Sequence, residues 1–253
     1  ATGARVRARL SARYRPTVMD ATPAIIKLAV FAVGGQGGGV LSNWIVEVAE
    51  RNGFRAQATS IAGVAQRTGA TIYYVEMAED TGRAPVFALA PSAGDVDILI
   101  AAELMESGRA MMRGLISPER TTLITSTHRM LAMSEKIVPG NGIADPAPVL
   151  AAGRAAARRY IALDMEQIAV AAGSVVSASL FGALAASASL PFSRESYEAT
   201  VRASGRGVEP SLQAFNAAFT AVTEETSANG SAAVKPAAQP TATGPASQVQ
   251  LWQ

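Results

Sequence analysis

The sequence predicts an α/β domain in which a doubly wound, mostly parallel sheet carries helices on both faces. Residues 25–33 (IIKLAVFAV) are a continuous apolar run rich in β-branched side chains, as expected of a parallel strand buried on both sides. The glycines of residues 34–39 end this run, and apolar residues then recur at helical spacing. Short apolar runs go on alternating with helical segments, which is typical of a Rossmann-like sheet.

The individual elements follow from periodicity and turn residues. Gly53 is typical of the end of the first helix. The apolar face of that helix comprises Val40, Leu41, Trp44, Ile45 and Val48. Further strands are predicted at residues 55–60, 70–77, 96–101, 121–126 and 160–163. Further helices are predicted at residues 103–115, 149–159, 165–188 with breaks, 195–204 and 211–223.

Residues 168–192 carry no charge and fit either a membrane span or a buried helix. Their length suits a span, which takes about 20 apolar residues. Ala, Ser and Gly dominate the segment, however, and Val176, Leu180 and Leu184 recur as one helical stripe. No Trp/Tyr belt or Lys/Arg cluster flanks it. We therefore expect a tightly packed helix inside the fold and no membrane span.

Charge and composition divide the chain into an arm (1–24), a domain (25–226) and a tail (227–253). Residues 1–18 hold five arginines and no acid, which leaves 17 basic against 20 acidic residues in 19–253. The arm fits binding to RNA, anionic lipid or an acidic partner, an organelle transit peptide, or residues ahead of a start at Met19. The tail is rich in Ala, Pro, Ser and Thr, cannot bury a core, and is expected to be disordered.

Composition excludes several kinds of site. The chain has no cysteine, so it cannot form disulfides, thiolate zinc sites or iron–sulfur ligation of its own. A single histidine excludes sites that need two imidazoles. Charged residues make up 17% against 49% hydrophobic ones, which favours a packed domain with much of its surface covered by partners. No secretory apolar segment follows the arm, and we expect a cytoplasmic protein.

The first candidate site is the glycine-rich turn between the first strand and the first helix. Glycines let backbone N–H groups approach an anion, and the start of a helix adds partial positive charge. The turn is neither a G-x-G-x-x-G fingerprint nor a P-loop, and no acid ends the strand at 55–60. It either faces a phosphate or cofactor, or packs tightly on a neighbouring backbone. The candidate ligand contacts are Gly34, Gly35, Gln36, Gly37, Gly38 and Gly39, with Ser42 and Asn43 capping the helix or bonding the same ligand.

Three other constellations carry candidate site residues. In residues 63–69 (GVAQRTG), Gln66, Arg67 and Thr68 fit either a carboxylate or phosphate contact or an arginine paired with a loop acid. Glu103 follows a strand, where α/β ligands bind, but a charge at a helix start explains it as well. Glu106 and Arg109 form an i, i+3 pair on a helix face, which is usually a surface salt bridge. His128 also follows a strand and fits either a base or cofactor contact or a hydrogen-bonded loop histidine.

Taken in order, these segments resemble the gamma-type domain of the 2-oxoacid:ferredoxin oxidoreductase family. Residues 33–37 (VGGQG) match its G-x-G-G-Q-G turn, and residues 63–69 match its G-M-A-Q-R-G-G with Val for Met and Thr for Gly. Its E-x-x-E-x-x-R stands intact at Glu103, Glu106 and Arg109, and its L-G-A-L helix corresponds to residues 181–184 (FGAL). The resemblance covers about residues 26–224 and is nearest to the small (beta) subunit of the indolepyruvate enzymes.

The resemblance implies a non-cluster subunit of a heteromeric enzyme, with no catalytic residue or metal site in this chain. Such an enzyme decarboxylates a 2-oxoacid, here arylpyruvate or indolepyruvate, to an acyl-CoA and passes electrons to ferredoxin. It implies that thiamine diphosphate, Mg and [4Fe-4S] clusters belong to a larger partner subunit, which agrees with the absence of cysteine. The resemblance also implies a place near the entrance for coenzyme A, the co-substrate, or for the 2-oxoacid. There the chain contacts coenzyme A, shapes the substrate pocket or only completes the fold.

Two alternatives remain open from the sequence. One is a stand-alone nucleotide-binding oxidoreductase with a pyrophosphate on the glycine turn, although the strand at 55–60 lacks the acid that a ribose needs. The other is a non-catalytic scaffold protein. If its basic arm binds nucleic acid, the binding is salt-sensitive and is lost when residues 1–18 are removed. The preferred interpretation includes no nucleic-acid partner.

Overall fold

The computed structural model describes residues 24–62, 70–131, 135, 143–205 and 207–229. Within them, one six-stranded sheet has the order β2-β3-β1-β4-β5-β6. The strands are β1 (Ile26–Ala32), β2 (Phe54–Ala62), β3 (Thr71–Glu79), β4 (Ile98–Ala101), β5 (Thr122–Ser126) and β6 (Arg159–Leu163). Each was predicted from the sequence, with bounds shifted by no more than two residues. The arm up to residue 23 and the tail from residue 230 lie outside the described residues.

The sheet is mixed in one place. β1, β4, β5 and β6 pair in parallel, whereas β3 pairs antiparallel with both β1 and β2. Only residues 63–69 and Ala70 separate β2 from β3, too few for the helical crossover that a parallel pair requires. β3 therefore runs against its neighbours, and the prediction of a mostly parallel sheet is confirmed for the other strands.

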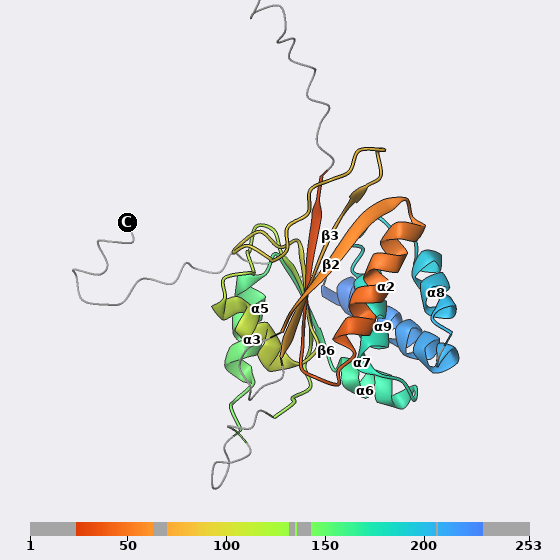
Figure 1. The fold of residues 1–253 in the computed structure, drawn as a ribbon. Coiled ribbons are helices and arrows are strands. Elements are labelled where there is room, and N and C mark those ends of the chain that lie inside the picture. The colour runs from red at the N-terminus through yellow and green to blue at the C-terminus, as the bar shows by residue number, and fades with distance from the viewer. Residues whose placement is uncertain (1–23, 63–69, 132–134, 136–142, 206, 230–253) are drawn as a thin grey trace, which may run out of the picture.

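Helices cover both faces of the sheet, which confirms the doubly wound arrangement (Figure 1). One face carries α3 (Leu104–Met112) and α5 (Ala147–Ala156). The other face carries α2 (Gly38–Arg51), α6 (Met165–Ala171), α7 (Val176–Ala186), α8 (Arg194–Ala203) and α9 (Val208–Asn229). α9 continues to Asn229, so residues 227–229, which were predicted to belong to the tail, are helical.

The sheet separates two hydrophobic clusters because successive strand residues point to opposite faces. In β1, Leu28 and Val30 belong to the larger cluster, together with the aromatic rings of α7, α8 and α9. Ala29 and Phe31 belong to the smaller cluster. Both sides of β1 are buried, as its unbroken apolar run predicts.

α7 is the helix predicted from the uncharged segment, and it is more enclosed than one stripe implies. All residues from Val176 to Leu184 are buried, including Ser177 and Ser179 on the sides away from the predicted stripe. A Cβ added at Gly182 would lie 2.2 Å from the carbonyl oxygen of Phe215, so α7 and α9 cross at backbone contact. Small residues were expected to allow such a close approach, and this is confirmed.

The helices can be compared with the length and apolar character that a membrane span requires. Among the described residues, no single helix has the length and apolar character to cross a bilayer. α6 and α7 pass the composition test together but are bent at 117°.

Candidate functional site

The carboxyl ends of β1, β4 and β5 meet at one edge of the sheet. Phe31 of β1 pairs with Ala101 of β4, which in turn pairs with Thr125 of β5. The chain leaves β1 for α2 on one face and leaves β4 for α3 on the other (Figure 1). This divergence is a topological switch point, the place where open α/β sheets bind their ligands.

The glycine turn lies at this switch point and begins α2 earlier than predicted. α2 starts at Gly38, and its N-cap is Gly37 in the left-handed conformation with φ 69°. Ser42 and Asn43 therefore lie in the second turn of the helix, Ser42 buried and Asn43 exposed. The prediction that they cap the helix is wrong, because the N-cap position is taken by Gly37 in the left-handed conformation.

The glycines of the turn divide into two groups. A Cβ at Gly38 would come within 2.6 Å of the Tyr73 ring and 2.8 Å of Ala32 Cβ, and one at Gly37 would come within 2.9 Å of Ser177 Oγ. These two glycines are needed for packing. Gly34 and Gly35 are exposed, and a Cβ at Gly35 would meet nothing within 4 Å. The exposed pair, with the partly exposed Gly39, remains the part of the turn that a ligand can reach.

Gln36 is buried under the turn and holds its shape. Its Oε1 accepts a hydrogen bond from the Val33 N–H at 2.8 Å, and its own backbone N–H donates to the Val33 carbonyl at 3.2 Å. Its Nε2 lies 3.2 Å from Nε2 of His128, at the end of β5. The Gln36 side chain is thus engaged inside the protein, and its role as a ligand contact stays a prediction.

His128 continues this set of contacts toward the start of α6. Its Nδ1 lies 2.7 Å from Ser126 Oγ, which accepts a hydrogen bond from the Met165 N–H at 3.1 Å. Burial lowers the pKa of His128 below its ordinary 6.5, while Glu166 and Asp164 oppose that shift. The structure thus supports the hydrogen-bonded loop histidine; its role as a ligand contact stays a prediction.

Glu103 and α3, the helix that it precedes, lie at the same edge of the sheet. Glu103 is the N-cap residue of α3 and is 2% exposed, and its Oε2 accepts from the Met130 N–H at 3.4 Å. Burial raises the pKa of its carboxyl above the ordinary value, against the effect of backbone N–H donors such as that of Met130. A ligand can reach this carboxyl only if the edge opens. Glu103 stays a prediction as a ligand contact.

The E-x-x-E-x-x-R segment has a structural role at Glu106 and Arg109. The Arg109 guanidinium bonds the Glu106 carboxylate, with Nε 3.0 Å from Oε2, and lies over the Phe31 ring at 4.8 Å from its centroid. Glu106 is 6% exposed, so the pair is more enclosed than the predicted surface pair. It fastens α3 to β1.

The remaining predicted site residues are not placed. Gln66, Arg67 and Thr68 lie outside the described residues. Ser126 and Ser177 are polar residues at this edge that were not among the predicted site residues. Ser126 stands two residues before His128, a spacing that offered a weak signal, whereas the contact of Ser177 with Gly37 had none in the sequence.

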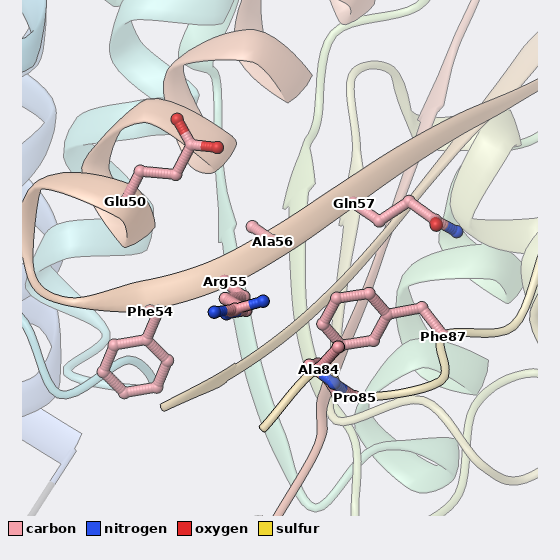
Figure 2. A pocket seen from close by; sticks show the side chains of 8 residues that line it. All are labelled: Glu50, Phe54, Arg55, Ala56, Gln57, Ala84, Pro85 and Phe87. Atoms are coloured by element: carbon pink, nitrogen blue, oxygen red, sulfur yellow. The ribbon is translucent and has the colours of Figure 1, made fainter. Parts of the chain in front are cut away.

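A separate groove lies at the start of β2 (Figure 2). It has a volume of about 490 Å³ and is lined by Glu50, Phe54, Arg55, Ala56, Gln57, Ala84, Pro85 and Phe87. Phe54 pairs with Glu79 at the end of β3 that lies beside the start of β1. No predicted site residue lines this groove.

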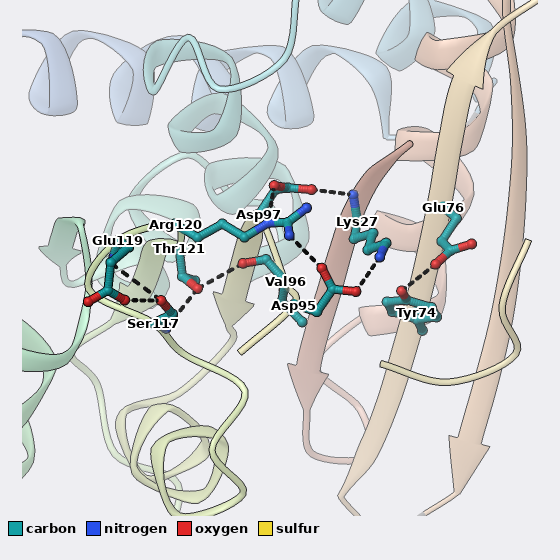
Figure 3. Close-up of polar contacts among 10 residues, drawn as sticks. All are labelled: Lys27, Tyr74, Glu76, Asp95, Val96, Asp97, Ser117, Glu119, Arg120 and Thr121. Carbon is teal, nitrogen blue, oxygen red and sulfur yellow. Dashed lines mark hydrogen bonds and ion pairs between the residues drawn. The ribbon is translucent and has the colours of Figure 1, made fainter. Parts of the chain in front are cut away.

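The amino ends of the strands carry charges instead of glycines (Figure 3). Asp97 Oδ1 accepts from Arg120 Nε at 2.7 Å, and Asp97 Oδ2 accepts from the Lys27 backbone N–H at 2.8 Å. Asp95 pairs with both Lys27 and Arg120. In the part of the chain that the structure describes, no group of three His, Asp or Glu side chains is arranged to hold a metal ion.

Comparison with known proteins adds the family. Residues 27–221 match the family model described as pyruvate ferredoxin/flavodoxin oxidoreductase. The indolepyruvate oxidoreductase subunit IorB of Thermococcus kodakarensis is 25% identical over 212 residues, which cover 78% of this chain and 96% of that protein. IorB of Pyrococcus horikoshii is 25% identical over 214 residues, with the same coverage of 78% and 96%.

Solved structures show the same fold. Pyruvate oxidoreductase subunit PORC of Thermotoga maritima aligns with a TM-score of 0.54 at 16% identity, covering 78% of this chain and 96% of its own. The gamma subunit of a keto/oxoacid ferredoxin oxidoreductase from Geobacter sulfurreducens aligns with a TM-score of 0.52 at 17% identity, covering 79% and 99%.

Proposed function

This chain belongs to the pyruvate ferredoxin/flavodoxin oxidoreductase family, and from that premise we propose that it binds coenzyme A for a larger, cluster-containing partner subunit. In this proposal the partner carries both thiamine diphosphate and the iron–sulfur clusters. The clusters belong there because this chain has no cysteine to ligate one. The family and the IorB relatives make this chain a non-cluster subunit of a 2-oxoacid:ferredoxin oxidoreductase. The 2-oxoacid proposed is an arylpyruvate such as indolepyruvate, after the names of those relatives.

The observation that carries the coenzyme A assignment is the exposed half of the glycine turn. Gly34 and Gly35 leave the backbone uncovered at the switch point, and Gly37 to Gly39 lead directly into α2. The first N–H groups of a helix have no partner within the helix and carry partial positive charge. A phosphate group of coenzyme A fits such a start of a helix of 14 residues.

The chain's own residues bind and orient and take no part in bond making. The turn holds the phosphates, so the thiol end of coenzyme A is directed to the partner, where thiamine diphosphate supplies the carbanion chemistry of decarboxylation. Among the described residues of this edge, the buried Glu103 is engaged with the Met130 N–H, and the buried His128 with Ser126 and Gln36. The reaction is proposed to take place in the cytoplasm, where 2-oxoacids and coenzyme A are available.

The sheet order disfavours a stand-alone dinucleotide-binding enzyme. In a dinucleotide fold the strand after the first helix lies next to the first strand and ends in the acid that binds the ribose. Here β2 is separated from β1 by β3 and ends in Ser60, Ile61 and Ala62. The glycine turn therefore lacks the second half of such a site.

Coexpression with the larger subunit tests the proposal. The purified complex is expected to contain iron and thiamine diphosphate and to reduce a dye only when a 2-oxoacid and coenzyme A are both present. A complex without iron or thiamine, or one whose reaction ignores coenzyme A, would overturn the proposed function.

A matched pair of glycine substitutions tests the turn itself. Gly35 and Gly53 both have positive φ (89° and 77°) and open space at the Cβ position, so Asp costs similar strain at either. Only Gly35→Asp puts a negative charge beside the proposed phosphate. We expect it to raise the KM for coenzyme A by roughly tenfold, the effect of a lost charge-assisted contact of ~1.4 kcal/mol. Gly53→Asp is expected to leave that KM unchanged, and equal values for both variants would remove the turn from the site.

A further inference from the structure

We propose that Gln36 and His128 are positioning residues that hold the glycine turn in its binding shape, and that protonation of His128 releases the turn. The inference rests on the proposed binding of coenzyme A at this turn. It follows from the hydrogen-bonding capacities of four neighbouring groups, which leave one arrangement of protons. Neither residue needs to touch the ligand.

The orientation of the Gln36 amide is fixed from one side. Its oxygen Oε1 accepts from the Val33 N–H at 2.8 Å, so its nitrogen Nε2 is the atom that faces His128. An amide nitrogen donates and cannot accept. At a separation of 3.2 Å, Nε2 of His128 must therefore be the acceptor and carry no proton.

The other ring nitrogen then carries the proton of the neutral imidazole. Nδ1–H donates to Ser126 Oγ at 2.7 Å, and the same oxygen accepts from the Met165 N–H at 3.1 Å. Met165 in turn accepts at its carbonyl oxygen from Ser179 Oγ at 2.6 Å. A continuous chain of hydrogen bonds thus connects the turn after β1 to the start of α6 and to α7.

A second proton on His128 breaks this chain at one bond. Protonated Nε2 would present an N–H to the amide N–H₂ of Gln36, so two donors would face each other. Gln36 can relieve the conflict only by rotating, and rotation gives up its bond to the Val33 N–H. The turn then loses the side-chain bond that holds its start at Val33.

The charged groups around His128 come from three elements. Asp164 and Glu166 at the start of α6 favour the protonated ring, and burial opposes them and prevails. At the start of α3, the buried Glu103 has a raised pKa, and the following Leu104 donates its N–H to the His128 carbonyl at 3.1 Å. Arg129, the next residue, is engaged with Glu135 and with the Ala144 carbonyl at 2.7 Å. The turn itself and the first residues of α7 contribute no ionisable side chain.

Two substitutions separate positioning from simple support. His128→Gln offers an amide oxygen to Gln36 and cannot take up a proton, whereas His128→Ala removes the acceptor. In the assembled complex, the wild-type KM for coenzyme A is expected to rise as pH falls below 6.5, the ordinary pKa of histidine. His128→Gln is expected to keep a KM near the wild-type value at pH 8 and to lose that rise.

His128→Ala gives the size of the contribution. Its KM for coenzyme A is expected to be about fivefold higher at pH 8, the effect of one lost hydrogen bond, while kcat changes less. Assembly of this variant with the partner is checked by gel filtration. A wild-type pH dependence in His128→Gln, or a wild-type KM in assembled His128→Ala, would overturn the inference.

An independent measurement reads the proton directly. His128 is the only histidine in the sequence, so ¹⁵N-histidine labelling of the full chain gives one set of imidazole signals. At pH 7.5 we expect the neutral ring with its proton on Nδ1, and a proton on Nε2 would overturn the inference while leaving the proposed function untouched. If instead the wild-type complex shows no coenzyme A-dependent reaction, the proposed function fails whatever the tautomer.

Discussion

The two ends of the parallel strands are held together by different kinds of polar contact. At the amino ends, Lys27, Asp95, Asp97 and Arg120 form an ion-pair network in which two acids match two bases (Figure 3). At the carboxyl ends, Gln36, Ser126 and a His128 with a lowered pKa are joined by hydrogen bonds beside exposed glycines. Ion pairs therefore link the strands at their amino ends, whereas hydrogen bonds among Gln36, Ser126 and His128 link the segments at their carboxyl ends.

This difference explains why one end suits a ligand. Charges that already face each other leave no net charge to attract an anion. The start of α2 offers backbone N–H groups and partial positive charge. Four predictions test the comparison between the two ends.

The largest effect is expected from close packing under the glycine turn. Gly38→Ala would place a methyl group 2.6 Å from the Tyr73 ring and 2.8 Å from Ala32 Cβ, and we expect a loss of about 2–3 kcal/mol from overpacking. Gly39→Ala is the matched control, because its Cβ would lie 3.6 Å from Tyr73. Urea unfolding of both variants gives the comparison. Equal stabilities would show that the carboxyl end is less tightly packed than its contacts indicate.

A smaller loss of stability is expected at the amino end. Asp97→Ala leaves the Lys27 N–H and the Arg120 guanidinium without their carboxylate, and we expect a loss of about 1–2 kcal/mol. The KM for coenzyme A in the assembled complex should not change, since the two ends lie at opposite edges of the sheet. Thermal unfolding and steady-state kinetics measure both. A raised KM would contradict the separation of the two ends.

The two ends should also respond to acid at different pH. The pKa of His128 is lowered by burial, so its stabilising contribution is complete above pH 6.5 and is lost as pH falls below it. The pKa of Asp95 is lowered mainly by its hydrogen bond from Lys27, so its contribution is lost only as pH falls below 3.8. Thermal melting from pH 3 to 8 is expected to show that His128→Gln differs from wild type in its slope near pH 6, and Asp95→Asn only at lower pH.

Glu103 makes the use of difference curves necessary. Burial raises the pKa of its carboxyl, so its contribution is complete below pH 4.5 and is lost as pH rises. That slope has the opposite sign to the slope of His128. Subtracting the His128→Gln curve from the wild-type curve removes it, and a difference without slope between pH 5 and 6.5 would count against the lowered pKa of His128.

The smallest effect on stability is expected from an exposed ion pair near the amino ends of the strands. Arg55 Nε and Asp80 Oδ1 lie 2.8 Å apart, with side chains 42% and 40% exposed. Water and salt screen such a pair, so Asp80→Asn should leave the melting temperature unchanged within error. A clear loss would indicate that surface charge at this end carries more stability than the Lys27–Asp97 network suggests.

Sequence reasoning was accurate where the signal was local. Local residue patterns predicted every strand, and the glycines after residue 33 predicted a turn that leads into a helix. The helix begins two residues earlier than predicted, at Gly38. Val40 was assigned to its buried face and is 46% exposed. Capping preference pointed to Ser42 and Asn43, and left-handed Gly37 supplied the cap.

The sequence by itself determined the α/β class, the position of the glycine turn, and the impossibility of a cluster ligated by this chain. Periodicity reports how a segment is buried, and composition reports which ligand atoms exist. Only the tertiary structure decided that β3 lies reversed between β2 and β1, and that Gln36 meets His128 across 92 positions of sequence. Strand order and side-chain contacts between distant segments depend on how the whole chain closes, and no local pattern records that closure.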